Sequence, residues 1–454
     1  MSQPPLRLAP LAGALLAALA LAPTARAQAP AARPQAAAAT TAFVDATVLP
    51  MDGRAPLAGQ TVVVRGDRIV AVGPAARTAV PAGATRVDAR GKYLMPGLAE
   101  MHGHVPPPNA PPQLTEDVLF LYVANGITTV RGMLGAPGQL ALRERTARGE
   151  VIGPTLYLAG PSFNAQSIDS PEEAVRKVRE QKAEGWDLLK VHPGLTRPEY
   201  DAMARTAREV GIRFGGHVPT EVGLLHAIEM GQETFDHLDG YVEHLRGDQG
   251  PVDSAQLADV VRRTRAANAW VVPTMALWEV LAGLPALDSL RAFPELRYMP
   301  PATVAQWTEL HRRRLADPQL DRAAAARTIA SRMAVLKALS DGGVRVLMGT
   351  DAPQQFSVPG FSLHRELLRM RAAGMTPAQI LASGTTRVGE YFAKSDRFGS
   401  VATGHRADLL LLDADPLADV ANLTRRAGVM VRGRWLSESE IQQRLATIAA
   451  RHRP

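Results

Sequence analysis

The sequence contains no cysteine. A disulfide therefore cannot staple the fold, and neither a thiolate nucleophile nor a cysteine-ligated zinc site is available. Stability must come from burial of apolar side chains, which make up 46% of the 454 residues. A chain of this length and composition can bury a large core, and one large domain with a smaller companion fits it better than several small modules.

Apolar runs long enough to cross a membrane comfortably are also lacking. The longest one, residues 11–21, follows Arg7 and precedes the small-residue sequence Ala25-Arg26-Ala27, which together form the pattern of a secretory signal and its cleavage site. We therefore expect a signal peptide over residues 1–27 and a periplasmic or secreted protein with no membrane span after cleavage. Retention of this segment as an N-terminal anchor is the alternative.

Blocks of lysine and arginine interleaved with aromatic residues, which are typical of nucleic-acid-binding proteins, do not occur. The formal net charge is +7 at pH 7, and Arg7 and Arg26 of the predicted signal contribute part of it. The remaining basic residues are scattered along the chain. We interpret them as solvated surface and expect no nucleic-acid partner.

Residues 28–41 are rich in alanine and proline and predict a disordered linker. Residues 42–93 and 398–436 contain short β-type runs broken by turns such as Gly66-Asp67. Because these short strand-like runs occur on both sides of the long central segment, we expect one small β-sandwich domain built from both chain ends. Residues 437–454 are expected to form a C-terminal helix or tail.

In the centre, residues 94–397, strand-like apolar runs alternate with amphipathic helical segments, as in a parallel sheet with helical crossovers. The candidate strands end near Met101, Met133, Gly160, His192, Val218, Leu238, Met275 and Gly349. Eight strands are the number that closes a (β/α)8 barrel. The predicted fold class is therefore α/β, a (β/α)8 TIM barrel with a small β-sandwich domain.

Polar side chains stand at the ends of five of these strands. His102 and His104 end the first, and their spacing directs both imidazoles to one side of a strand, a metal-chelating geometry. The other strand ends carry Lys190 and His192, His217, His237 and Asp351. Since the carboxyl ends of barrel strands meet at one mouth, we expect these groups to lie together. Taken singly, each also has a structural explanation, such as helix capping for Asp351.

This series resembles the metal-dependent amidohydrolase superfamily, in which H-x-H follows strand one, lysine strand four, single histidines strands five and six, and aspartate strand eight. The resemblance extends from Ala42 to Trp435 and includes Met95-Pro96-Gly97-Leu98 and Met348-Gly349-Thr350-Asp351. The chain is most similar to the branch of imidazolonepropionase-like proteins and binuclear-zinc Xaa-Pro dipeptidases, the prolidases. The resemblance implies a metal-dependent hydrolase acting on carbon–nitrogen bonds.

Imidazole and carboxylate ligands suit borderline divalent ions such as Zn²⁺, and a set of six exceeds what one tetrahedral ion can use. The ligand set consists of His102, His104 and Asp351 for the more buried ion, His217 and His237 for the more exposed one, and Lys190 between them. An ammonium group would be repelled by both ions. The resemblance therefore implies that Lys190 is carboxylated to a carbamate that bridges the two.

The expected reaction is amide hydrolysis without a covalent intermediate. A hydroxide bridging the ions is available near neutral pH, because the metals lower the pKa of water, and would attack the carbonyl. Asp351 would take the proton and pass it to the leaving amine. A secreted enzyme of this kind is expected to act as a dipeptidase or carboxypeptidase-like hydrolase on small amide substrates, dipeptides or N-acyl amino acids. The sequence does not decide whether the protein forms a homo-oligomer.

Four further residues are candidates for substrate binding: His192, Tyr241, Arg131 and Trp278. His192 shares its strand face with Lys190 and could donate a hydrogen bond to the oxyanion or to a substrate carboxylate. The other three follow strands and could line a pocket. Many prolidase-like relatives carry an aspartate where this chain has Gly132, so the role of that loop does not carry over.

Two other functions are open at this point. A mononuclear cyclic amidase or deaminase of the same superfamily would use one metal and a proton-shuttling glutamate. Glu221 follows His217 by four positions, whereas the deaminase motifs have this glutamate three positions on and lack a lysine at the place of Lys190. The second alternative is a non-catalytic metal-binding protein, although none of the expected ligands is missing from the sequence.

Overall fold

The computed structural model describes residues 39–107 and 109–453, so the predicted signal and residues 28–38 of the predicted linker lie outside the described residues. Strand β1 (Thr40–Val48) begins inside the predicted linker, because Thr40 and Thr41 pair with Arg65 and Val64 of the next strand. The prediction of disorder up to residue 41 is therefore wrong for these two residues. Among the described helices, none combines the length and the apolar character needed to cross a bilayer.

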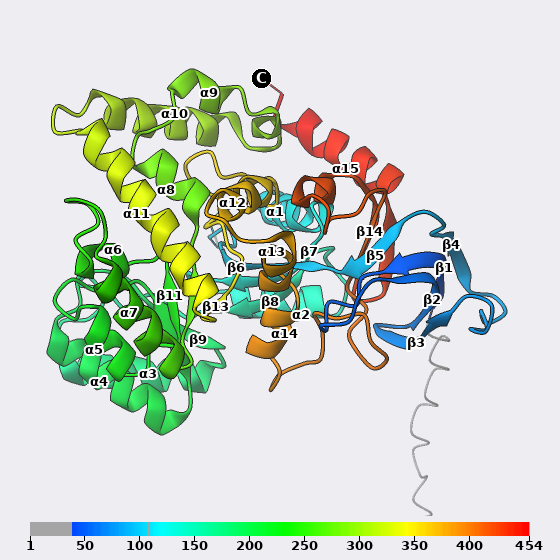
Figure 1. The fold of residues 1–454 in the computed structure, drawn as a ribbon, viewed down its shortest axis with the longest axis horizontal. Helices are drawn as coiled ribbons and strands as arrows, with labels where there is room; N and C mark the ends of the chain where they lie inside the picture. Colours follow the sequence, from blue (N-terminus) through cyan, green and yellow to red (C-terminus); the bar gives the residue numbers. More distant parts are fainter. Residues whose placement is uncertain (1–38, 108, 454) are drawn as a thin grey trace, which may run out of the picture. The chain divides into compact units, whose positions relative to one another are not determined.

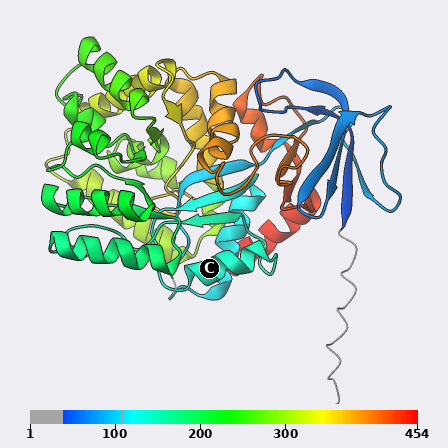
Figure 2. The same cartoon turned by 90° about the horizontal axis from the view of Figure 1, so that it is seen from below.

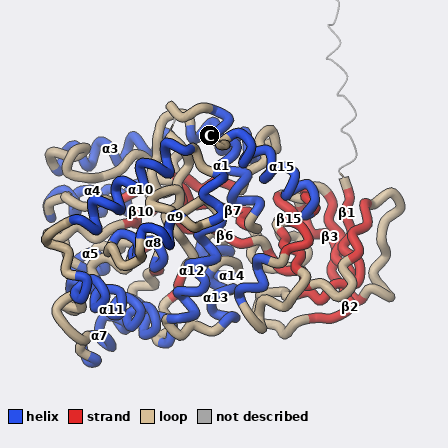
Figure 3. The backbone as a smooth tube through the Cα atoms, turned by 90° about the horizontal axis from the view of Figure 1, so that it is seen from above, coloured by secondary structure: helices blue, strands red, loops and turns tan. Residues whose placement is uncertain are grey.

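Strands from both ends of the chain pair in one mixed sheet (Figures 1 and 3). Its order is β16-β15-β14-β5-β1-β2-β3, and β4 also pairs with β1. Besides β1, the strands of this sheet are β2 (Leu57–Arg65), β3 (Arg68–Pro74), β4 (Thr85–Asp88), β5 (Tyr93–Pro96), β14 (Leu409–Leu412), β15 (Arg426–Val431) and β16 (Arg434–Ser437). The hydrogen bonding is that of one sheet, where a sandwich of two was predicted, because β1 pairs with β4 along its first half and with β5 at its end.

The centre contains parallel strands in a three-stranded sheet, β6-β7-β8, and a five-stranded sheet, β13-β12-β11-β10-β9. Their bounds are β6 (Leu98–Gly103), β7 (Ile127–Gly132), β8 (Thr155–Leu158), β9 (Leu188–Val191), β10 (Arg213–Gly216), β11 (Thr234–Asp236), β12 (Trp270–Val272) and β13 (Arg345–Val346). Each predicted central strand has a counterpart here. The arrangement is a TIM-barrel-like α/β fold.

Backbone contacts connect the two parallel sheets on both sides. Ala159, just past β8, forms a parallel bridge with Leu188 of β9. On the other side, the amide of Met101 in β6 donates to the carbonyl of Met348 beyond β13, at 2.8 Å. The first contact joins the ends of the sheets at β8 and β9, and the second brings the carboxyl ends of β6 and β13 side by side.

Helices follow most of the central strands (Figure 2). They are α1 (Pro112–Ala124), α2 (Gln139–Ala147), α3 (Pro171–Glu184), α4 (Arg197–Val210), α5 (Leu224–Glu229), α6 (Tyr241–His244), α7 (Ser254–Ala266), α8 (Met275–Leu281), α9 (Leu287–Arg291), α10 (Pro301–Ala316), α11 (Arg322–Asp341), α12 (Phe361–Ala372), α13 (Pro377–Ser383), α14 (Thr386–Tyr391) and α15 (Glu438–Arg451), with short 3-10 helices at Pro294–Tyr298 and Val420–Thr424. Helix α3 illustrates how sequence sets the ends. Ser170 accepts a hydrogen bond from the amide of Glu173, and Gly185 adopts a left-handed conformation (φ 89°) that ends the helix.

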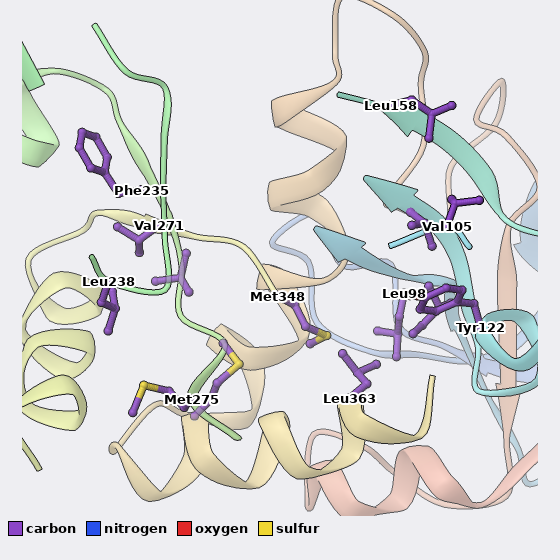
Figure 4. Packing of buried hydrophobic residues seen from close by; sticks show 14 of the residues in the cluster. Leu98, Val105, Tyr122, Leu158, Phe235, Leu238, Val271, Met275, Met348 and Leu363 are labelled. Atoms are coloured by element: carbon purple, nitrogen blue, oxygen red, sulfur yellow. The ribbon is translucent and has the colours of Figure 1, made fainter. Parts of the chain in front are cut away.

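The main core lies between the central strands and the helices around them (Figure 4). Phe235 and Val271 come from neighbouring strands and are fully buried, as are Leu363 of α12 and Tyr122 of α1. Burial of each such side chain contributes about 1.5–3 kcal/mol. This core fixes the strands, and the strands fix the positions of the polar groups at their ends.

Helix α8 takes its N-terminal cap from a distant helix. Its preceding residue makes no side-chain cap, and the carboxylate of Glu366 in α12 instead accepts hydrogen bonds from the amides of Met275 and Ala276, at 2.9 and 2.8 Å. Glu366 is fully buried, and burial raises its pKa from 4.5 to about 7. The folded protein therefore holds this proton over a pH range in which the unfolded chain releases it.

We expect the free energy of unfolding to fall as the pH rises from about 4.5 to about 7, because the Glu366 proton is lost first from the unfolded chain. Glu366→Gln should remove this part of the pH dependence. It should also lower stability by about 1–3 kcal/mol, since one amide loses its acceptor. Urea unfolding at several pH values measures both effects, with the exposed Glu221→Gln as control. An unchanged pH profile in Glu366→Gln would contradict the assignment.

Candidate metal centre

Strand β6 and the residue that follows it present two histidines, His102 and His104, to the mouth of the parallel strands. His102 is buried, with its Nε2 3.1 Å from the Nζ of Lys190 and 3.5 Å from Oδ1 of Asp351. The side chain of His104 is 20% exposed, and its Nε2 lies 2.5 Å from the same Asp351 oxygen. The two-residue spacing on a strand therefore brings both imidazoles to one carboxylate.

Lys190 lies on β9, a strand whose four residues are all buried. Burial lowers the pKa of the Lys190 amine, while the carboxylates of Asp236 and Asp351 act in the opposite direction. A buried lysine is thereby shifted toward its neutral form. The neutral amine is the form that can react with CO2, so its setting is compatible with the carbamate that the sequence predicts.

His217 and His237 each have one ring nitrogen already engaged. The Nδ1 of His217 lies 2.6 Å from Oδ2 of Asp239, and the Nδ1 of His237 lies 2.7 Å from Oγ1 of Thr274. Their ring centroids are 4.5 Å apart. Histidines that ligate metals generally use one nitrogen in this way and present the other to the ion. In both residues these contacts use Nδ1, so Nε2 is the ring nitrogen available to bind an ion.

Asp351 joins these groups. Its backbone amide donates to the carbonyl of His102 at 2.6 Å, and its left-handed conformation (φ 64°) places the carboxylate among the histidines. Oδ2 lies 3.8 Å from Nε2 of His237, which is buried without a hydrogen-bond partner among the described residues. Ligand atoms of His102, His237 and Asp351 all lie within 4.8 Å of one another.

The donor set fits divalent metal ions. Burial, followed by nearby positive groups, lowers the pKa of both His102 and His237 well below its usual value, so the rings are neutral and their lone pairs are available. Neutral imidazole together with carboxylate is the ligand chemistry of zinc-type ions. The unpartnered Nε2 of His237 would be costly to bury unless something bound it.

Two acidic residues that the sequence did not mark lie against the ligands, and one of them, Glu100, joins the segments that carry His102 and Asp351. Glu100 accepts hydrogen bonds from the Thr350 amide (2.8 Å), the Thr350 hydroxyl (2.6 Å) and the His102 amide (3.0 Å). It thus ties β6 to the loop that carries Asp351, and burial raises its pKa to about 8. Asp236 lies 2.9 Å from Nδ1 of His102, but out of line for a hydrogen bond. Glu100 was discoverable, since it shares a strand face with His102.

Two of the predicted substrate-binding residues, Arg131 and Tyr241, are fully buried and bonded to other parts of the protein. Arg131 is fully buried within β7 and donates to the carbonyl of Met101 (2.6 Å) and to both oxygens of Asp236 (3.2 Å each). Tyr241 is also fully buried, with its hydroxyl 2.8 Å from that of Thr264. This structure therefore does not place these two side chains where they could contact a substrate. Arg131 neutralises a buried carboxylate, and Tyr241 packs in the core.

The other two predicted substrate-binding residues lie beside the cluster. The ring of His192 stacks on that of His217 with centroids 5.0 Å apart, and its Nδ1 is hydrogen-bonded with the hydroxyl of Ser162. Burial lowers the pKa of His192 to about 2, so its ring is neutral. Trp278 of α8 meets His237 edge-on, at 6.3 Å between centroids. Their contact with substrate stays a prediction.

Comparison with known families agrees with this geometry. The model of the amidohydrolase family matches residues 93–436. The chain belongs to the amidohydrolase family. Its predicted class, a hydrolase acting on carbon–nitrogen bonds, is confirmed at the level of the family, whereas the activity and substrate of this amidohydrolase are matters for proposal.

Individual relatives are distant. Adenine deaminase of Rubrobacter xylanophilus is 26% identical over 405 residues, which cover 85% of this amidohydrolase but only 56% of the deaminase. Among solved structures, bottromycin amidohydrolase superposes with a TM-score of 0.71 at 24% identity and 90% coverage of each chain. A Xaa-Pro dipeptidase with methionine bound in its active site gives 0.66 at 18% identity, covering 88% of this chain and all of that one. These structures share the fold.

Proposed function

We propose that this amidohydrolase is a secreted, binuclear metal-dependent enzyme that hydrolyses dipeptides or N-acyl amino acids. The observation that carries the proposal is the position of Lys190. Its buried amine lies 3.1 Å from Nε2 of His102, in a cluster with Asp351 and three further histidines. An unmodified ammonium group would be repelled by ions bound here, whereas a carboxylated lysine supplies two oxygen ligands to a pair of ions.

The proposal includes a closed (β/α)8 barrel, because closure brings all the strand ends to one mouth. The bridge between Ala159 and Leu188 and the hydrogen bond from Met101 to Met348 support it, since they join the two parallel sheets at both junctions. The ligands at the ends of β6, β9, β10, β11 and β13 then face one another across the mouth.

The chain's own residues define the roles in catalysis. His102, His104 and Asp351 would hold one ion, His217 and His237 the other, and carboxylated Lys190 both. When bound, such ions acidify water and polarise an amide carbonyl. Asp351 accepts the proton that the attacking water loses and delivers it to the amide nitrogen as the carbon–nitrogen bond breaks. The products are a carboxylic acid and a neutral amine.

His192 is suited to hold the carbonyl oxygen of the substrate. When the hydroxyl of Ser162 donates to Nδ1, the proton of the neutral ring resides on Nε2, which becomes a donor. Asn164 supports this direction by donating to the Ser162 oxygen at 3.2 Å. A donor of this kind stabilises the negative charge that develops on the oxygen during attack.

Substitution His192→Ala is expected to lower kcat about 10²–10³-fold, the usual effect of removing one oxyanion donor. The number of metal ions per chain should not change, since His192 is not among the proposed ligands. Steady-state kinetics with metal analysis tests this, with Ser162→Ala expected to give a smaller loss in the same direction. A full loss of metal in His192→Ala would instead make it a ligand.

Two observations argue against the alternative function, a mononuclear deaminase. Glu221, the candidate proton shuttle, is exposed, whereas such a shuttle must lie within reach of the reacting atoms. The deaminase motifs also lack a lysine at the position of Lys190. The 26% identity to an adenine deaminase nevertheless makes adenine a necessary member of any substrate panel.

Hydrolysis of a panel of dipeptides, N-acyl amino acids, cyclic amides and adenine by zinc-loaded protein tests the proposal. We expect cleavage of dipeptides or N-acyl amino acids, loss of that activity with a chelator, and recovery on adding zinc. Metal analysis should give two ions per chain. Deamination of adenine with one ion per chain would favour the alternative, and two ions with no hydrolysis of any substrate would favour a binding protein.

A further inference from the structure

Arg332 of α11 is a buried cation, 1% exposed, that contacts the side of the cluster formed by His217 and His237. Its Nη1 donates a hydrogen bond to the backbone carbonyl of His237. Its Nη2 lies 3.7 Å from Oδ1 of Asp239, and its guanidinium lies over the ring of Trp278, 3.8 Å from the centroid.

Asp239 links this cation to a second histidine. While Oδ1 faces Arg332, Oδ2 lies 2.6 Å from Nδ1 of His217. The carboxylate is thereby held from both sides, and the ring of His217 takes its orientation from it. A chain of contacts runs from Arg332 through Asp239 to His217.

The turn that carries His237 also depends on an external partner. His237 and Leu238 are consecutive left-handed residues, with φ of 64° and 57°. Non-glycine residues rarely adopt this conformation, and it persists where surrounding contacts hold it. The hydrogen bond from Arg332 to the His237 carbonyl is such a contact. Arg332 therefore acts on the turn that aims one ligand as well as on the carboxylate that aims the other.

The opposite side of the cluster is supported differently. His102 and the loop of Asp351 are joined by Glu100 and by the backbone bond between Asp351 and His102. The contacts of Arg332 described above include none of these groups. Loss of Arg332 should therefore disturb one half of the ligand set and leave the other half in place.

We propose that Arg332 is the positioning residue for the more exposed metal ion, acting on His217 through Asp239 and on His237 through its backbone carbonyl. This inference rests on the proposed binuclear function and deepens it. It assigns a specific task to a residue that lies 95 positions from His237 in the sequence. Partners of this kind typically contribute about 10–100-fold to metal affinity.

The test is zinc binding by the Arg332→Met protein, which keeps a long side chain but removes the charge and the donors. Zinc titration against a competing chelator should show one ion bound as in the wild type and a second with a Kd about 10–100-fold weaker. Excess zinc should restore two ions per chain. The matched control is Arg327→Met on the exposed part of the same helix, which should bind two ions like the wild type.

Asp239→Asn provides a second variant, which also serves if Arg332→Met does not fold. It should weaken binding of the same ion, and the double variant should bind that ion more weakly than the wild type by much less than the product of the two single effects, because both residues act along one chain of contacts. Unchanged affinity for both ions in the single variants, or equal weakening of both, would overturn the inference. A wild-type protein that binds only one ion would instead overturn the proposed function itself.

Discussion

Asparagine in place of Asp351 is expected to lower amide hydrolysis by about 10²–10⁴-fold, the usual contribution of a proton-transferring group. The carboxylate lies 2.5 Å from Nε2 of His104 and 3.5 Å from that of His102, whereas the other acids of the cluster, Asp236 and Asp239, face the Nδ1 atoms of His102 and His217. Asparagine keeps the size and one oxygen ligand but cannot accept the proton. The amine would then have to leave as an anion.

The measurement is kcat/KM on the best dipeptide or N-acyl amino acid, with the number of metal ions determined on the same sample. Asp117→Asn is a suitable control, because Asp117 is also a buried carboxylate but pairs with Arg451 away from the cluster. We expect the control to hydrolyse at the wild-type rate. Retention of more than a tenth of the activity in Asp351→Asn, with both ions bound, would remove Asp351 from proton transfer.

Lys190→Ala is expected to lose both affinity for metal and activity, because the carbamate would contact both ions. Loss of a ligand should exceed the 10–100-fold effect of losing a ligand's partner. Alanine also leaves space where the long side chain was, so acetate or propionate at high concentration should restore part of the binding by supplying the missing carboxylate oxygens. Lys177→Ala, on helix α3, is the control.

Binding of zinc by Lys190→Ala, with and without the short carboxylic acid, measures this effect. Activity under the same conditions gives the second readout. A variant that keeps full activity with one ion per chain would favour the mononuclear alternative. A variant that loses activity but keeps two ions bound at the wild-type affinity would make Lys190 a catalytic group and not a bridge.

Much of the fold could be predicted because apolar runs and their polar ends are local signals. The H-x-H of β6 and the aspartate after β13 were recognisable as strand ends before their contacts were known. The direction in which a side chain points was harder to predict from the sequence. Arg131 was expected to line a pocket, but it lies within β7 and its side chain is fully buried there.

The supporting residues of the cluster could not be found from the sequence alone. Asp239 follows His237 closely, yet its partner is the more distant His217. Arg332 comes from a helix far along the chain, where it is one of several arginines with no distinguishing pattern. Such pairings arise only when the strands and helices pack, and only the three-dimensional structure contains them.

A crystal structure of zinc-loaded protein prepared in bicarbonate shows whether Lys190 bridges two metal ions. We expect two ions about 3.5–4 Å apart, with density for a carbamate on the Lys190 nitrogen between them. His102, His104 and Asp351 should contact one ion, and His217 and His237 the other. An unmodified Lys190 with a single ion, or with none, would contradict this expectation.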